Sequence, residues 1–313
     1  MGQAWTCSGL RWSADGPELV WNGGRRTALT WGKRVAFGVA EGGVRTCVGA
    51  RGHACPLRSV VPGRSTGARC EECARLDRAH SVAADTIADD PRPYRVYLAW
   101  FGPGLVKVGI TAVERGTARL LEQGAVCFSW LGSGPLMAAR RTEELLRAAL
   151  RVPDRIPYAE KRAVRFALPG TEGERAAEIA ELHARAVALG GWPESLTREP
   201  FRPVDHVRVF GLGAEGAAVV GEVVELVPAG VVSGELVAAA GPDLHLATER
   251  GVVVLDTRLM TGWGLVPVGG DGSGGSDGSG GSGGGGGSGG GRVEVPVRAL
   301  RAAGGGARQK GLF

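Results

Sequence analysis

Residues 94–150 contain the pattern that most restricts the fold of this chain. Two runs rich in β-branched and aromatic residues, Tyr94–Trp100 and Leu105–Ile110, have the composition of strands. The residues between them, Phe101-Gly102-Pro103-Gly104, favour a turn. The two runs therefore predict a β-hairpin.

A helix, a strand and a second helix are expected after the hairpin. Thr111–Glu114 has the spacing of a capping box, in which two side chains accept the free backbone N–H groups at the start of a helix. Gly124 is typical of the left-handed residue that ends a helix. Ala125–Trp130 predicts a strand, and Pro135–Leu150 predicts a helix. The predicted order is strand, strand, helix, strand, helix.

Glu143 interrupts the apolar face of the second helix. That face is formed by four residues at helical spacing: Leu136, Ala139, Leu146 and Leu150. A carboxylate on a buried face is unfavourable unless it is paired, hydrogen-bonded or bound to a metal. Two interpretations follow: a rim residue that reaches water, or a metal-binding carboxylate at the edge of a cleft.

Four cysteines precede the hairpin in two pairs, Cys47 with Cys55 and Cys70 with Cys73. The Cys-x-x-Cys spacing of the second pair is typical of a zinc knuckle, and two pairs supply the four thiolates of a tetrahedral site. Seven residues separate the first pair, so His53 could replace one of its thiolates. A redox dithiol at Cys70 and Cys73 and a metal-free cluster are the alternatives. Four protein ligands leave no open position, so the zinc would be structural.

The rest of the chain predicts a β-rich protein around this region. Short strands with glycine turns at both ends of the chain suggest one shared β-structure, a barrel or a sandwich. The predicted divisions are a β-rich segment (1–46), the four-Cys segment (47–75), the core (94–166), an amphipathic helix (171–190), a second β-rich domain (205–300) with a disordered Gly/Ser loop (269–291), and a flexible tail (301–313).

Three motifs in the core resemble known families. They are Val96-Tyr97-Leu98-Ala99, Lys107-Val108-Gly109-Ile110-Thr111, and Arg119 followed by Gln123-Gly124-Ala125. The hairpin Tyr, the Lys-Val-Gly, the helical Arg and the later Glu143 are similar to the GIY-YIG nuclease core. The fuller run after four cysteines, over about residues 47–165, is similar to an uncharacterised bacterial family, the domain of unknown function 2797.

The resemblance implies an α+β fold with a small ββαβα core of the GIY-YIG type. It also implies that Tyr97 helps activate a water, that Arg119 holds the phosphate, and that Glu143 binds a divalent metal, Mg or Mn. Two residues depart from the nuclease pattern: Arg95 stands where the first Gly would be, and Lys107 where the second Tyr would be. An ammonium near a phenol favours the phenolate, so Lys107 would assist Tyr97 as a base.

Basic residues are concentrated in the same core. Residues 94–166 contain twelve Lys or Arg and six Asp or Glu, whereas the whole chain has a net charge of +5. Such a surface attracts phosphate backbones, and ordinary solvated helix faces are the alternative. Only four of the 37 basic residues are Lys, so the Lys at 107 suggests a need for a titratable amine.

The ends of the chain bear on location and partners. The sequence has no apolar run of about 18 residues and no export signal at its start, so we expect a cytoplasmic protein with no membrane partner. Its last residues, with Gln309, Leu312 and Phe313, resemble the peptide that docks on the bacterial sliding clamp. Chance is the alternative for so short a motif.

Three functions are therefore expected. The first is a metal-dependent phosphodiesterase that acts on nucleic acid, with DNA as the preferred substrate, and that is stabilised by structural zinc. The second is a nucleic-acid-binding zinc protein of the same fold without cleavage activity. The third is an adaptor that binds the sliding clamp through its tail.

Overall fold

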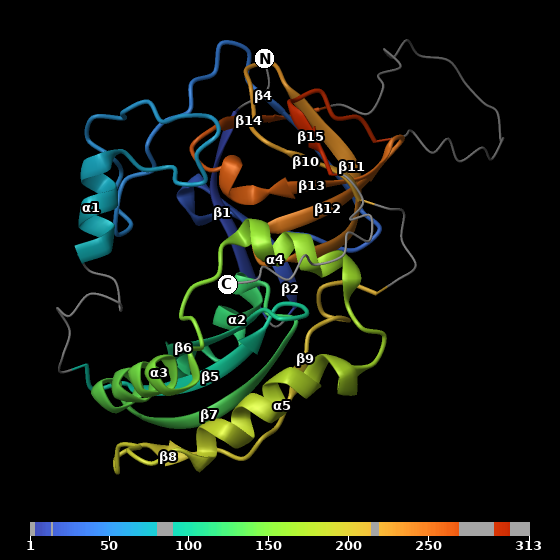
Figure 1. The fold of residues 1–313 in the computed structure, drawn as a ribbon. Coiled ribbons are helices and arrows are strands. Elements are labelled where there is room, and N and C mark those ends of the chain that lie inside the picture. Colours follow the sequence, from blue (N-terminus) through green and yellow to red (C-terminus); the bar gives the residue numbers. More distant parts are fainter. Residues whose placement is uncertain (1–3, 14, 80–89, 214–218, 269–290, 301–313) are drawn as a thin grey trace, which may run out of the picture.

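The computed structural model describes residues 4–13, 15–79, 90–213, 219–268 and 291–300. The described residues form two β-sheets with helices at their faces and a cysteine-rich segment on one side (Figure 1). The protein is thus α+β and rich in strands. The predicted Gly/Ser loop, except for Gly291, and the predicted tail lie outside the described residues.

The smaller sheet contains the predicted hairpin. Its five strands are β5 (Pro93–Trp100), β6 (Val106–Ala112), β7 (Cys127–Pro135), β8 (Thr197–Arg198) and β9 (Val204–Asp205). The hairpin strand β6 is the edge strand, β5 is next to it, and β7 pairs with β5, all antiparallel. The short helices that follow β6 are η2 (Val113–Arg115) and α2 (Ala118–Gln123), and α3 (Leu136–Leu150) follows β7.

The capping box predicted at Thr111 is absent. Strand β6 continues through Thr111 to Ala112, and the Thr111 hydroxyl is buried without a hydrogen-bond partner among the described residues. Neither η2 nor α2 has a side-chain cap. Pairing with β5, which continues to Ala112, therefore decides the position of Thr111, and the helix begins later than its sequence signal indicates. Gly124 ends α2 in the left-handed conformation, as expected.

Helices cover both faces of the smaller sheet. One face of β5, with Val96 and Leu98, packs against α3 and against α5 (Glu172–Ala188). Helix α5 corresponds to the amphipathic helix predicted over residues 171–190, and it begins with a complete capping box at Thr171. The other face, with Tyr97, packs against Leu120 of α2.

The larger sheet joins the two ends of the chain. Its ten strands are β1 (Trp5–Ser13), β2 (Gly16–Trp21), β3 (Arg26–Ala28), β4 (Arg34–Val39), β10 (Val219–Val223), β11 (Val231–Ala240), β12 (Asp243–Thr248), β13 (Gly251–Asp256), β14 (Gly264–Pro267) and β15 (Val297–Ala299). Strand β4 pairs with β11, and β14 lies between β4 and β1. Segments from both ends of the chain thus share one β-structure.

The larger sheet encloses one hydrophobic core. Its fully buried residues include Cys7 of β1, Val232 of β11 and Leu244 of β12. Among the described residues no pairing joins the outer strands β3 and β15, so the strand order is that of an open sheet rather than a closed barrel. Within the predicted second β-rich domain, residues 207–210 form a turn rather than a strand, and this turn places Phe210 in the core.

Buried ion pairs attach the larger sheet to helix α4 (Tyr158–Val164) and to η3 (Arg165–Ala167). Arg162 pairs with Asp243 at 2.7 Å, with Asp256 at 2.8 Å and with Glu222 at 3.1 Å. Arg165 pairs with Asp243 at 2.9 Å, and both side chains are inaccessible to solvent. Such pairs fix orientation more than they stabilise, because both charges lose their hydration. They hold α4 in one position against β12.

Arg45 attaches the four-Cys segment to the larger sheet. Its side chain is 1% exposed and donates hydrogen bonds to the backbone oxygens of Pro62 and Ser65 on one side and of Arg258 and Thr261 on the other. Residues 258–261 include the end of η4 (Thr257–Leu259), which follows β13. The segment itself has a single helix, α1 (Glu71–Ala79), and further contacts with the rest of the protein include the ion pair of Arg64 with Glu225 at 3.2 Å.

Candidate functional site

The four predicted cysteines come together in a metal-ligating arrangement. The Sγ atoms of Cys47, Cys55, Cys70 and Cys73 all lie within 4.8 Å of one another. Tetrahedral zinc with bonds of about 2.3 Å needs sulfurs about 3.8 Å apart, so the cluster has nearly the required size. His53 is exposed and is not part of the cluster, so four thiols form the site.

Backbone N–H groups prepare these sulfurs to carry charge. The N–H groups of Gly49 and Cys70 donate to the Sγ of Cys47 at 3.3 and 3.2 Å. Hydrogen bonds from the backbone of Ser59 lower the pKa of Cys55 to about 6. Donors of this kind favour thiolates, which are the form that binds metal. The four cysteines can therefore hold a metal ion of the type that thiolate ligands select.

Tyr97 is at the centre of the predicted catalytic residues and is buried. Its side chain is 1% exposed, and its hydroxyl accepts a hydrogen bond of 2.8 Å from the Gln123 amide. The phenol lies against Gly109 of the neighbouring strand, where an added Cβ would come within 2.4 Å of the Tyr97 oxygen. Burial raises the pKa of Tyr97, although Gln123 and Arg119 oppose the shift. The phenol is therefore neutral at physiological pH.

Lys107 lies on the same face of the sheet as Tyr97. It is opposite Ala99 in the β5–β6 register, two residues along the strand from Tyr97. Its ammonium is 5.8 Å from the centre of the Tyr97 ring and donates a hydrogen bond of 3.1 Å to the backbone oxygen of Asp154. Burial, and then the charge of Arg119, lower the pKa of Lys107 to about 8.

Arg119 is the accessible member of the predicted set. Its side chain on α2 is 44% exposed and lies 3.9 Å from Glu122, one turn along the helix. The same Glu122 also accepts from Arg115 at 2.7 Å. Exposure and a weak ion pair leave Arg119 able to contact an external anion.

Glu143 completes the predicted face of α3. Leu136, Ala139 and Leu146 are buried as expected, whereas Glu143 is half-buried at the edge of that face. Burial and then the charge of Asp154 raise the pKa of Glu143, while Lys107 lowers it. Helix α3 covers the face of the sheet opposite Tyr97. The carboxylate nevertheless interacts with Lys107 on the edge strand β6.

The structure thus brings the four predicted residues within electrostatic range of one another. The charges of Arg119 and Glu143 both act on Tyr97 and on Lys107. The four do not line one open surface, however, because Tyr97 is enclosed by the apolar residues Phe101, Leu120 and Phe128. In this conformation the Tyr97 phenol is therefore not accessible to solvent.

Lys161 is a site residue that sequence reasoning missed. It is 3% exposed, lies 3.9 Å from the centre of the Phe101 ring and donates a hydrogen bond of 3.2 Å to the backbone oxygen of Gln123. Burial, and then the charges of Lys107 and three arginines, lower the pKa of Lys161 to about 7. The scarcity of lysine was a usable signal, because two of the four lysines in the chain are buried here.

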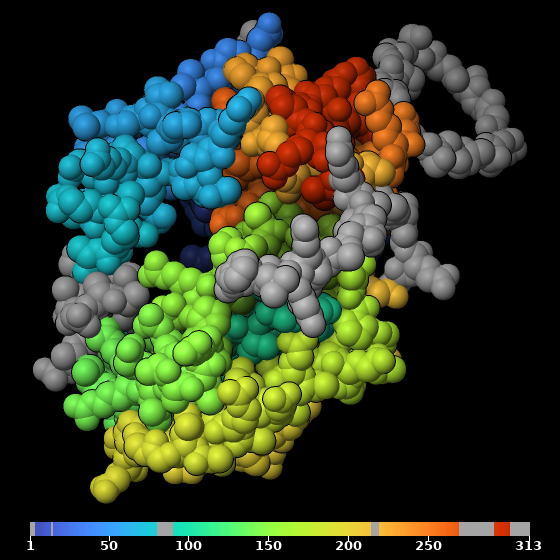
Figure 2. Space-filling model, in the orientation of Figure 1, coloured from blue at the N-terminus to red at the C-terminus, as the bar shows by residue number. Residues whose placement is uncertain are grey.

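A cleft opens beside this group of cations. It has a volume of about 540 Å³ and lies where the four-Cys segment, β1 and the core meet. Figure 2 shows the hollow between the four-Cys segment (blue to cyan) and the core (green). Its lining includes Arg11, Arg69, Glu122, Tyr158 and Arg258. Arg258 lies 4.2 Å from the centre of the Tyr158 ring.

Two further predictions concern a clamp-binding motif at the chain end and the absence of a membrane partner. Gln309, Leu312 and Phe313, the predicted clamp-binding residues, lie outside the described residues. Within the described part of the chain, every helix is too short or too polar to span a bilayer.

Comparison with known proteins identifies a family for this chain. The family model described as protein of unknown function (DUF2797) matches residues 32–265, which include the four-Cys segment, the core and most of the larger sheet. No curated protein and no solved structure matched the chain. The match supports the resemblance to DUF2797 and does not extend to GIY-YIG nucleases. Because the matched residues cover most of its length, the chain belongs to the DUF2797 family.

Proposed function

We propose that the protein binds nucleic acid along the cleft between the four-Cys segment and the core. The observation that carries the proposal is the crowding of cations beside that cleft. Burial lowers the pKa of Lys107 and of Lys161, the charge of Arg119 lowers both further, and the charges of Lys107 and Arg258 add to the effect on Lys161. Like charges held together are unfavourable in the unbound protein, and a polyanion relieves their repulsion.

The cleft has the composition that a phosphate backbone requires. Arginine side chains from three separate parts of the chain line it: Arg11, Arg69 and Arg258. Guanidinium groups donate paired hydrogen bonds to phosphate oxygens, which a lysine cannot do. The acidic residue in the lining, Glu122, is bound by Arg115. Binding to the backbone needs no base-specific contact, so the proposal covers DNA and RNA.

We infer that the metal of the four-Cys segment is zinc with a structural role. Four thiolates in a closed site are the donor set that zinc selects among the common metal ions, and they leave no position for a substrate. The segment has few other buried groups: Val61 is the buried apolar residue that packs with the cysteines. Zinc would therefore shape one wall of the cleft.

The test is the salt dependence of binding. Affinity for a single-stranded or duplex oligonucleotide should fall linearly with the logarithm of salt concentration. Arg11→Ala and Arg119→Ala should each weaken binding and reduce the slope by about 1. Arg250→Ala is the matched control, because Arg250 is exposed in the β12–β13 turn and outside the cleft. Affinity independent of salt, or equal effects of all three substitutions, would refute the proposal.

Metal-dependent phosphodiester cleavage is the second candidate, and Glu143 favours it. Burial, and then the nearby carboxylate of Asp154, raise the pKa of Glu143, and two neighbouring carboxylates are a suitable donor set for Mg²⁺ or Mn²⁺. Glu143 would hold the ion, which would supply charge neutralisation at the phosphate. Arg119 would bind the phosphate, and Lys107 would orient it. The buried Tyr97 is the reason that binding ranks first.

Cleavage can be separated from binding with one substitution. Glu143→Gln keeps the size of the side chain and should abolish cutting in Mg²⁺ or Mn²⁺ while leaving the affinity for nucleic acid nearly unchanged. Glu144→Gln, at an exposed position on the same helix, is the control. Equal cutting by Glu143→Gln and the parent protein, or no cutting by either, would end the enzyme hypothesis.

A further inference from the structure

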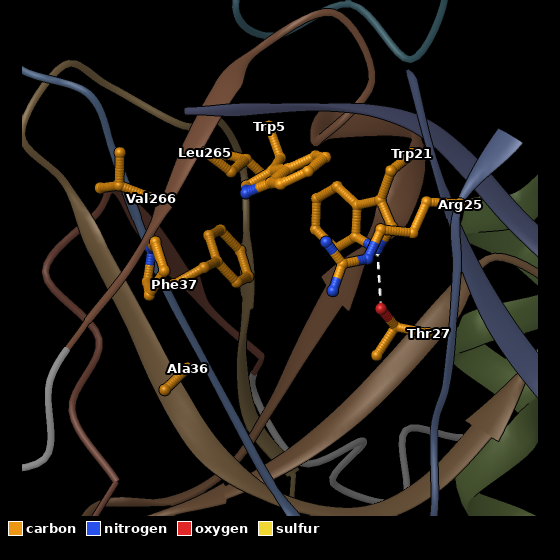
Figure 3. Close-up of a pocket in the computed structure, with 9 residues that line it drawn as sticks. Trp5, Trp21, Arg25, Thr27, Ala36, Phe37, Leu265 and Val266 are labelled. Carbon is orange, nitrogen blue, oxygen red and sulfur yellow. Dashed lines mark hydrogen bonds between the residues drawn. The ribbon is translucent and has the colours of Figure 1, made fainter. Parts of the chain in front are cut away.

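A second pocket lies in the larger sheet, outside the cleft. It has a volume of about 220 Å³ and lies between β1, β2, β4 and β14. Figure 3 shows the indoles of Trp5 and Trp21 and the ring of Phe37 around this space, with Arg25 at its side. Strand β1 contributes Trp5 to this pocket and Arg11 to the cleft, about 20 Å further along the strand.

The aromatic rings of the pocket are fixed in place. Trp21 donates a hydrogen bond of 2.9 Å from its indole nitrogen to the Thr27 hydroxyl (Figure 3). Phe37 is 6% exposed and belongs to the core of the sheet. Trp5 and Trp21 are only half-buried, and Trp21 also packs against the core of the sheet. Rigid, partly exposed indoles are suited to stacking against a planar ligand.

Arg25 gives the pocket a charge that is not neutralised within the protein. Its guanidinium lies 4.8 Å from the centre of the Trp5 ring. Within the described part of the chain, no carboxylate pairs with it, whereas the adjacent Arg26 pairs with Glu18 at 3.4 Å. A guanidinium stacked on an indole keeps its N–H donors free for an anion.

We propose that this pocket binds one base of a single-stranded nucleic acid, stacked against Trp5 and Trp21, with an adjoining phosphate on Arg25. The inference rests on the proposed function and specifies single-stranded nucleic acid as the form that the protein would bind. Pockets for drug-sized ligands begin at about 300 Å³, so this one suits a single planar ring system. A base in a duplex is already stacked and paired, and its face is therefore inaccessible to the two indoles.

The experiment compares two oligonucleotides of about 16 residues with the full-length protein. One is oligothymidylate, and the other has abasic sites and therefore the same phosphates without bases. We expect about tenfold tighter binding of the oligothymidylate. Trp21→Leu, which keeps an apolar side chain in the core, should remove this preference without changing the salt slope. Trp31→Leu is the control, because Trp31 is 37% exposed and outside the pocket.

Arg25 is tested separately with Arg26 as its matched control. Arg25→Ala should reduce the salt slope for oligothymidylate by about 1, and Arg26→Ala should not. Equal affinity of the parent protein for the two oligonucleotides would overturn the pocket and leave the proposed function intact. This comparison uses the unsubstituted protein and so does not depend on the folding of a variant. Failure to bind either oligonucleotide would overturn both proposals.

Discussion

The Gln123 amide at the end of α2 donates a hydrogen bond of 2.8 Å to the hydroxyl of Tyr97 on β5. Lys161 of α4 donates to the backbone oxygen of the same Gln123 at 3.2 Å, and an ammonium is favourable at the carboxyl end of a helix. Gln123 thus connects the phenol, the helix that carries Arg119, and α4. These contacts give Gln123 of the Gln123-Gly124-Ala125 motif a structural role.

Gly109→Ala should displace Tyr97. The new Cβ would lie 2.4 Å from the phenol oxygen, so the ring must move and lose its hydrogen bond with Gln123. Overpacking of this kind typically costs about 1–3 kcal/mol of unfolding free energy, measurable by denaturant titration. Gly170→Ala is the control and should change stability by less than about 0.5 kcal/mol, since no atom lies within 4 Å of its Cβ position. Equal stability of the two variants would contradict the geometry.

The sequence predicted the hairpin, α3 and the four-Cys cluster because each has a local signal. Alternating apolar residues define β5 and β6, and the apolar spacing on α3 correctly places Glu143 at the edge of a buried face. The helix predicted over residues 171–190 begins with a capping box at Thr171, whereas the capping box predicted at Thr111 was wrong. Both sites have Thr followed by Glu three residues later. Only tertiary contacts decide that Thr111 lies in a strand and Thr171 at the start of a helix.

The parts that could not be predicted depend on contacts between distant residues. Lys161 and Asp243 are buried because α4 packs against the larger sheet. The ion pair between Arg162 and Asp243, for example, joins residues 81 positions apart in the sequence. No periodicity in either segment indicates its partner. The cleft and the aromatic pocket likewise form where separate segments meet. The burial of Tyr97 follows from α2 and the loop beyond α3, which the motif comparison does not describe.

Asp243→Asn should be strongly destabilising. Asp243 is inaccessible to solvent and accepts from Arg162 and Arg165; Arg162 keeps Asp256 and Glu222, but the substitution leaves the buried guanidinium of Arg165 without its counter-charge. Removing one member of a buried pair typically costs about 3–5 kcal/mol. Asp77→Asn is the control: Asp77 pairs with Arg69 at 3.3 Å on the surface, and such pairs are worth about 0–1 kcal/mol.

The same aspartate predicts a pH dependence of stability. Burial alone would raise the pKa of Asp243, but the hydrogen bonds from Arg162 and the charge of Arg165 lower it below its usual value. A carboxyl with a lower pKa in the folded state stabilises the protein above the unfolded pKa of about 4, and this contribution is lost as the pH falls further. The parent protein should therefore lose stability below about pH 4 more steeply than Asp243→Asn. Parallel acid denaturation curves would contradict this assignment.

Lys161→Met should change how the free energy of unfolding depends on pH above about pH 7. Because the pKa of Lys161 is about 7 when folded and 10.5 ordinarily, the unfolded state binds more protons between these values. The stability of the parent protein should therefore rise with pH across this interval, by at most about 1.4 kcal/mol per pH unit from this lysine. The variant should lose the contribution of Lys161 and show a smaller rise, from Lys107, when denaturant midpoints are measured at several pH values. Lys33→Met, at an exposed position, should retain the full rise.

Removal of the metal should unfold the four-Cys segment before the rest of the protein. The purified protein should contain about one zinc per chain, and Cys70→Ser/Cys73→Ser should contain none, because half of the ligands are lost. Cys127→Ala, at a buried position in β7 far from the cluster, should keep its zinc. A chelator should then make residues 47–75 sensitive to protease while the core stays resistant. Arg45 helps attach the segment to the larger sheet, and because few other groups are buried in the segment, the proposed zinc would supply most of its internal stability. Protection that persists without metal would show that Arg45 and Val61 suffice to fold it.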